Sequence, residues 1–208
     1  MQVNNAKQLG PTGGMVTDAI KSLDADGFTL GTHTGANGDG YDYYWVAFKA
    51  GAGELKVDSY VGDGNATQSI TVGFQPAWVV VMEEAVARAR HQSASMTDTA
   101  YFSGKINDGS AITALTADGF QVNDTQDADG NRHNRAGITY HYFAFKKVSG
   151  KMNEGTYDGV DTGDDADDRN ITGVGFQTEY VIVKNATSDD NTRAVGRPAS
   201  RSAAPAST

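Results

Sequence analysis

Two acidic stretches hold the side chains most able to do chemistry. Residues 124–131 place oxygen donors at short spacing around Gly130, and residues 158–168 hold six aspartates. Calcium takes six to eight oxygen ligands from loops of this kind. We therefore consider calcium as the one cofactor that the sequence suggests. The candidate ligands are Asp124, Asp127, Asp129 and Asn131 in the first stretch and Asp161, Asp164 and Asp165 in the second.

A simpler interpretation of both stretches remains open. Neither stretch matches the twelve-residue EF-hand loop, because the acidic residue at its last position is missing. Aspartate, asparagine and glycine are also the residues that favour tight turns between strands. The same holds for a milder acidic stretch at residues 35–42. The stretches are therefore either calcium loops or solvated hairpin turns.

The sequence offers no catalytic group that stands out. Its four histidines are His33, His91, His133 and His141, and no two have the i, i+3 or i, i+4 spacing of helical metal ligands. No nucleophile elbow, zinc-protease motif or phosphate loop occurs. The absence of cysteine excludes disulfides and thiolate metal sites. We predict that the protein is not an enzyme and has no catalytic residues.

Aromatic side chains recur at alternate positions in two similar segments, as Tyr43 and Trp45 and as Tyr140 and Tyr142. Alternate residues of a strand share one face, so each pair is expected to lie on one face of a sheet. Such rings either fill the buried face of a β-sandwich or form an exposed platform that stacks on sugars. His141 lies between two of them and is predicted to face the opposite way, as a packed or surface residue.

Charge and composition narrow the class of partner. The formal net charge of −9 argues against nucleic acid, whose phosphates would be repelled. No apolar run approaches the ~20 residues that span a bilayer, so we expect no membrane partner. Residues 1–5 lack a charged region followed by an apolar stretch, so we expect no signal peptide.

The elements that must position these groups are nearly all strands. Short runs rich in β-branched and aromatic residues alternate with Asp-Gly, Asn-Gly and Gly-Gly turns. We predict strands at residues 29–32, 43–49, 55–61, 68–72, 78–82, 140–147 and 180–183. Residues 83–90 are the one plausible helix, but they follow a strand without a clear cap, so a loop stays open as the alternative. The pattern indicates an all-β protein of β-sandwich or jelly-roll type.

A long internal repeat organises these strands. Residues 25–28 return at 117–120, residues 43–49 at 140–146, and residues 70–75 at 171–177 with one insertion. Offsets of roughly 92 to 102 residues are the size of a domain.

The ends of the chain divide one copy of this repeat. We assign residues 54–148 to a complete unit, 1–50 to the back half of a second unit, and 155–208 to its front half. Half a β-unit cannot bury its own apolar face, so each half needs a partner. Three arrangements stay open: a circularly permuted second unit, exchange of halves between subunits, or a fragment of a longer repeat protein.

The repeated motifs resemble a poorly characterised β-domain of tailed-phage virion proteins, also found in prophage-like sequences. The residues that carry the resemblance are the corner Gly73-Phe74-Gln75-Pro76 with its partial copy Gly175-Phe176-Gln177, the turn Asp26-Gly27-Phe28-Thr29-Leu30-Gly31, and the strand Trp45-Val46-Ala47-Phe48-Lys49. The resemblance covers most of the chain and brings no catalytic residues with it.

The resemblance implies a virion structural protein that decorates or cements a capsid, or forms part of a tail or fibre. It would be made in the host cytoplasm and carried in the extracellular particle. Its partners would be other copies of itself, in a homo-oligomer or lattice, and other virion structural proteins. Two alternatives stay open: a self-polymerising surface filament subunit, and a glycan-binding β-sandwich module.

Overall fold

The computed structural model describes residues 5–7, 9, 15–84, 88–102, 111–126, 130–159, 170–185 and 194–199. Its regular structure consists of short antiparallel strands and, within these ranges, one short helix, α1 (Thr34–Asn37). The predicted all-β, sandwich-like class is confirmed. The strands form several separate sheets, the two largest of which lie in the middle of the chain.

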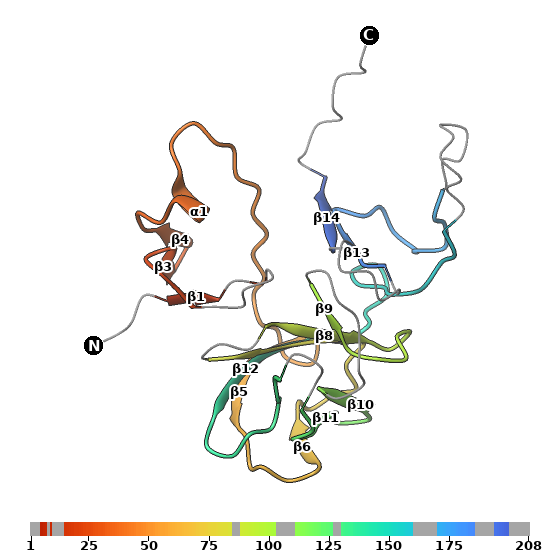
Figure 1. The fold of residues 1–208 in the computed structure, drawn as a ribbon. Helices are drawn as coiled ribbons and strands as arrows, with labels where there is room; N and C mark the ends of the chain where they lie inside the picture. The colour runs from red at the N-terminus through yellow and green to blue at the C-terminus, as the bar shows by residue number, and fades with distance from the viewer. Residues whose placement is uncertain are drawn as a thin grey trace.

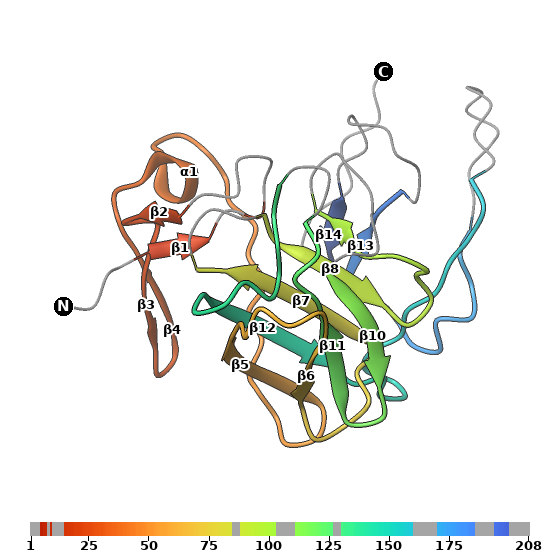
Figure 2. The same ribbon diagram turned by 60° about the horizontal axis from the view of Figure 1, so that its bottom comes forward.

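These two sheets face each other as a β-sandwich within residues 54–148 (Figure 2). The larger sheet has the order β5 (Leu55–Val61), β12 (Thr139–Phe145), β7 (Trp78–Glu83), β8 (Arg90–Ser93) and β9 (Ala100–Tyr101). The smaller sheet has the order β10 (Ile112–Thr116), β11 (Gly119–Val122) and β6 (Gln68–Thr71). Every strand pair is antiparallel.

The core of the sandwich is built from alternate residues of these strands. In β12, Tyr140, Tyr142 and Ala144 are buried and face the smaller sheet, whereas His141 is exposed. The ring of Tyr142 meets the fully buried Phe120 of β11 edge to face, with centroids 5.2 Å apart. This contact joins the two sheets through the middle of the core.

The central strand β7 is buried on both faces. Val79 and Val81 belong to the core between the sheets, and the intervening Val80 points the other way yet is also fully buried. The uninterrupted apolar run of this strand predicted such double burial. The outer face of the larger sheet is therefore covered around Val80 by other parts of the chain.

The ends of the chain lie on that outer side (Figure 1). The N-terminal part has two hairpins, β1 (Asn5–Lys7) with β2 (Met15–Thr17) and β3 (Ile20–Asp24) with β4 (Gly27–Leu30). The C-terminal part has one hairpin, β13 (Tyr180–Val183) with β14 (Val195–Pro198). Figure 1 shows the two parts facing each other above the larger sheet, with the smaller sheet beneath it.

Two elements differ from the sequence predictions. Of the two interpretations of residues 83–90, the helix is wrong for the described residues, because Glu83 ends β7 and Arg90 begins the antiparallel neighbour β8. The predicted strand at 43–49 is also wrong: residues 41–50, all described, are extended but belong to no strand. A strand exists only with a hydrogen-bonded neighbour, and local composition does not supply one.

Candidate functional site

The C-terminal hairpin reproduces a hairpin of the complete unit in the same register. Trp78 stands opposite Ser93 in β7–β8, and Tyr180 stands opposite Pro198 in β13–β14. Three further pairs follow in step in both ladders. The corners that lead into the hairpins also match, since Gly73 has φ 92° and Gly175 has φ 88°. The described corner and hairpin of the front half thus fold like their counterparts in the complete unit.

The N-terminal hairpin β3–β4 reproduces β10–β11, including its irregularity. In each ladder three pairs run in register from the Asp-Gly turn, and the pairing then shifts at a bulge. A bulge bends and twists its strand, so its recurrence at the same step gives the two hairpins the same local shape. The hairpin of the back half is therefore built as its counterpart in the complete unit.

The extended residues 42–48, which we call the aromatic segment, are the counterpart of β12. They contain Tyr43 and Trp45 where β12 has Tyr140 and Tyr142. The ring of Trp45 meets Phe28 of β4 edge to face, with centroids 5.6 Å apart and planes at 72°. Phe120 and Tyr142 meet at the same angle of 72°. The aromatic segment thus already faces its own smaller sheet in the orientation of β12.

The turns that follow the aromatic segment and β12 are also alike. Gly51 is bridged to Leu55 after the first, and Val148 is bridged to Met152 after the second. Each turn contains one glycine with positive φ, 73° at Gly53 and 76° at Gly150. By this correspondence residues 152–158 occupy the position of β5, the strand that flanks β12 in the complete sheet.

The counterparts of the strands that flank β12 do not form one sheet among the described residues. In the complete unit β12 pairs with β5 on one side and β7 on the other. Their counterparts by the repeat are residues 152–158 and β13, which are described without a strand between them. The rings of the aromatic segment remain open to solvent: Trp45 is 68% exposed, and Phe48 is 54% exposed.

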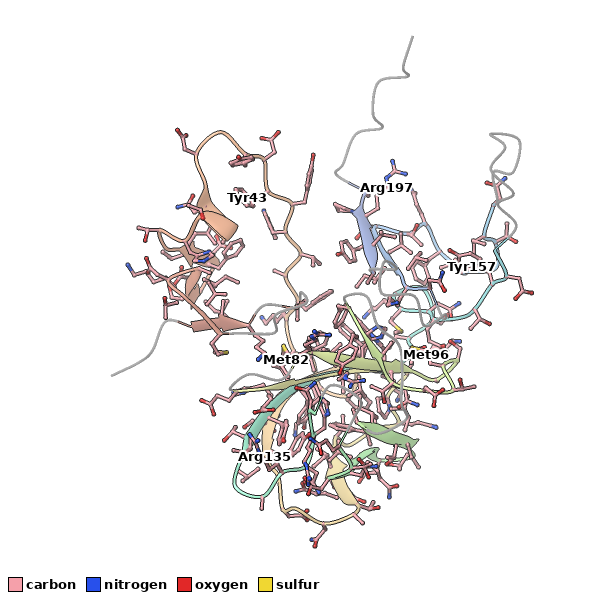
Figure 3. All side chains as sticks on the ribbon, in the orientation of Figure 1. Tyr43, Met82, Met96, Arg135, Tyr157 and Arg197 are labelled. Carbon is pink, nitrogen blue, oxygen red and sulfur yellow. The ribbon has the colours of Figure 1, made fainter. Side chains whose placement is uncertain are left out.

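A cavity of about 180 Å³ separates the aromatic segment from the C-terminal hairpin. Tyr44, Trp45 and Val46 line one side of it. Tyr180, Gly196 and Pro198 line the other. Figure 3 shows Tyr43 and Arg197 on the two parts of the chain that face each other across this space.

The predicted calcium ligands do not come together among the described residues. Asp124 accepts a hydrogen bond from Arg132 Nη1 at 2.7 Å, and Asn131 donates one to the Tyr101 hydroxyl at 3.3 Å. Asp127, Asp129, Asp161, Asp164 and Asp165 lie outside the described residues. Within the described ranges no three histidine or acidic side chains gather into a group suited to a metal ion. Calcium binding stays a prediction.

The histidines occupy separate places. His33 caps α1 by accepting from the Gly35 amide at 3.0 Å, and His141 is exposed on the outer face of β12, as predicted. His133 is fully buried, and His91 is nearly so. Burial and, to a smaller extent, the positive charge of nearby Lys184 together lower the pKa of His91 from 6.5 to about 4. A histidine with this pKa stays neutral at pH 7.

The four aromatic residues do not share an exposed platform. Tyr140 and Tyr142 are buried, and burial raises the pKa of Tyr142 to about 12. Tyr43 and Trp45 are exposed on the aromatic segment. The two pairs therefore match in sequence position but differ in burial, because only the first pair lies in a completed sandwich.

Two contacts at this site were not predicted from the sequence. The ion pair of Glu54 with Lys151 and the ring contact of Phe48 with Phe145 join the turns of the two copies. The repeat itself carried the signal, since aligning the turns after each Ala-Phe-Lys motif places both pairs at matching positions.

Comparison of the chain with protein-family models, with curated proteins and with solved structures gave no match. Among the described residues no helix is long and apolar enough to cross a membrane.

Proposed function

We propose that this chain is a non-enzymatic virion structural protein that decorates or cements a capsid, or forms part of a tail or fibre. The observation that carries the proposal is the split repeat, whose two halves keep the hairpin registers of the complete unit. Each half keeps its apolar residues exposed until a complementary half covers them. A chain made of such units acts mainly by associating its β-sheets with complementary β-structure.

The motif residues support this proposal because they have structural roles. Gly73 and Gly175 form matching corners at positive φ, where a side chain would be strained. Phe28 and Phe120 lie next to the Asp-Gly turns and pack on the aromatic residues opposite. The residues that resemble the virion domain are thus the ones that shape each sandwich.

The test is the presence of the chain in particles. Particles released by the source of this sequence should be purified by density gradient and analysed by quantitative peptide mass spectrometry. We expect the chain at a fixed ratio to the major capsid protein, and we expect the purified chain to rebind particles stripped of it. Its absence from particles that contain the other structural proteins would overturn the proposal.

Light scattering of the purified chain over a concentration series, with and without calcium, distinguishes the filament alternative from the virion proposal. A decoration or tail protein is expected to remain a small discrete species without its particle. Growth into long polymers in the absence of any particle would favour the filament subunit. Growth only with calcium would add the acidic loops to the interface and support calcium binding.

A further inference from the structure

Equivalent residues of the two copies touch each other where the copies meet. Glu54 and Lys151 hold matching places in the two turns, 97 residues apart, and their side chains pair at 3.0 Å. Phe48 and Phe145, the last residues of the aromatic segment and β12, meet edge to face with centroids 5.0 Å apart. Each of these residues thus contacts its own counterpart.

Contacts of this kind restrict how one copy is related to the other. A screw operation moves every point by at least its translation along the axis, so equivalent atoms in contact allow almost no translation. Stacking one two-layer unit on another would need a translation of about 20 Å, since sheets pack about 10 Å apart. The 5.0 Å between Phe48 and Phe145 is far below that value. The relation therefore includes little translation, unlike the step of an open helical stack.

We infer that the second unit closes within one chain, with the aromatic segment inserted between residues 152–158 and β13 of the same molecule. The cavity between this segment and the C-terminal hairpin supports the choice of occupant, because Trp45 of the segment and Tyr180 of β13 already line it together. The inference concerns how the chain closes and does not depend on the proposed virion role.

The complete unit supplies the register of the insertion. Phe145 pairs with Trp78 and Ala144 with Val79 in the β12–β7 ladder. The matching pairs in the second unit are Phe48 with Tyr180 and Ala47 with Val181. The insertion places Trp45 on the inner face, against Phe28, where Tyr142 lies against Phe120 in the complete unit.

The closed unit also explains the residues that flank the slot. In the complete unit Tyr60 of β5 stacks on Tyr140, with centroids 5.0 Å apart and planes at 13°. The counterparts are Tyr157, which is 47% exposed, and Tyr43, which is 42% exposed. Insertion of the aromatic segment brings these two rings into the same stacked pair and removes both from water.

Disulfide trapping tests the register and the occupant together. The natural chain has no cysteine, so the double variant Ala47→Cys, Val181→Cys carries two thiols only. We expect mild oxidation to cross-link it within one chain, with a yield that does not depend on protein concentration. The matched control is Ala47→Cys, Ile182→Cys, in which a shift of one residue puts the second thiol on the opposite face. We expect the control to cross-link at least tenfold more slowly.

Other outcomes of the trapping would overturn the inference. Disulfide-linked dimers and ladders from the first variant would mean that the aromatic segment inserts into another copy. Equal cross-linking of both variants, or none, would mean that this register is wrong. Neither result bears on whether the chain is found in particles, so the inference and the proposed function fail separately.

Tryptophan fluorescence gives a second measurement without cysteines. The chain has two tryptophans, so Trp78→Phe leaves Trp45 as the single reporter. We expect blue-shifted emission and weak quenching by acrylamide at every protein concentration, because the closed unit buries Trp45. Emission typical of a solvent-exposed indole in the folded, dilute protein would contradict closure within the chain.

Discussion

The indole of Trp78 donates a hydrogen bond from Nε1 to Nδ1 of His91 at 3.3 Å, across the hairpin that joins β7 to β8. His91 also lies against Phe102, with ring centroids 4.6 Å apart, and is only 5% exposed. The acceptor role at Nδ1 and the apolar surroundings both favour the neutral imidazole. The positive charge of Lys184 acts in the same direction.

This arrangement predicts a loss of stability in acid. The pKa of His91 is lowered from 6.5 to about 4 in the folded state, so between these values the unfolded chain binds a proton that the folded one does not. Above pH 6.5 His91 is neutral in both states, and the free energy of unfolding is not reduced by its titration. As the pH falls from 6.5 towards 4, the free energy of unfolding decreases by about 3 kcal/mol in total. Urea unfolding at pH 7.5 and pH 4.5 measures it.

The variant His91→Asn is the control for that prediction, because its amide oxygen can accept from Trp78 but does not titrate. We expect its free energy of unfolding to fall less between the two pH values than that of the natural chain. An equal fall in both proteins would show that other groups cause the acid sensitivity.

Phe120 should be among the most important residues of the complete sandwich, because it is fully buried and contacts both Tyr60 and Tyr142. Phe120→Ala is expected to lower the free energy of unfolding by about 3–5 kcal/mol. Val57 lies on the outer face of β5 and is 58% exposed, so Val57→Ala is expected to lower the free energy of unfolding by less than about 1 kcal/mol. Chemical denaturation of both variants checks the contrast, and similar costs would mean that the sandwich does not pack as described.

Gly119 should tolerate no side chain, because a Cβ there would lie 1.9 Å from the carbonyl oxygen of Ile70 in the neighbouring strand β6. Gly119→Ala is expected to push β6 away from β11 and to destabilise the protein by about 1–3 kcal/mol. Gly51→Ala is the matched control, since a Cβ at that turn position meets nothing within 4 Å. Thermal unfolding of the pair would contradict the prediction if both variants melted alike.

The ion pair of Arg135 with Glu83 should contribute more than an exposed pair, because the Glu83 side chain is only 4% exposed. Arg135→Met leaves that carboxylate buried without its partner at 3.2 Å and is expected to cost about 1–3 kcal/mol. Lys56→Met breaks a pair with Asp58 in which both side chains are exposed, and should cost under about 1 kcal/mol. Denaturation of both variants at low and high salt measures their losses in free energy of unfolding. Equal losses would argue that burial of Glu83 does not strengthen its ion pair.

The strands that the sequence predicted best are those whose own residues carry a clear local pattern. Residues 55–61 and 180–183 coincide with β5 and β13, and residues 78–82 fall within β7. Alternation, turn residues and apolar runs are local signals, so they mark these strands well. The repeat then extended the prediction from one copy to the other.

Local sequence signals did not predict the structure of the aromatic segment. Its composition is that of a strand, yet a ladder for it depends on segments more than a hundred residues away. The partners of Asp124 and Asn131 were equally hidden, because nothing in the acidic stretch indicates that Arg132 and Tyr101 bind them. Long-range pairing and side-chain partners of this kind come from the tertiary structure alone.

The contact between Glu54 and Lys151 is favourable only because the two copies of the repeat differ in sequence at this position. A rotation axis between two identical chains would place each of these residues opposite itself, as two glutamates or two lysines, and like charges at that distance repel. Once both copies belong to one chain, the two positions are free to diverge to opposite charges. Glu54 and Lys151 therefore attract each other at a place where two identical chains would bring like charges together, whereas Phe48 and Phe145 keep a contact between identical residues.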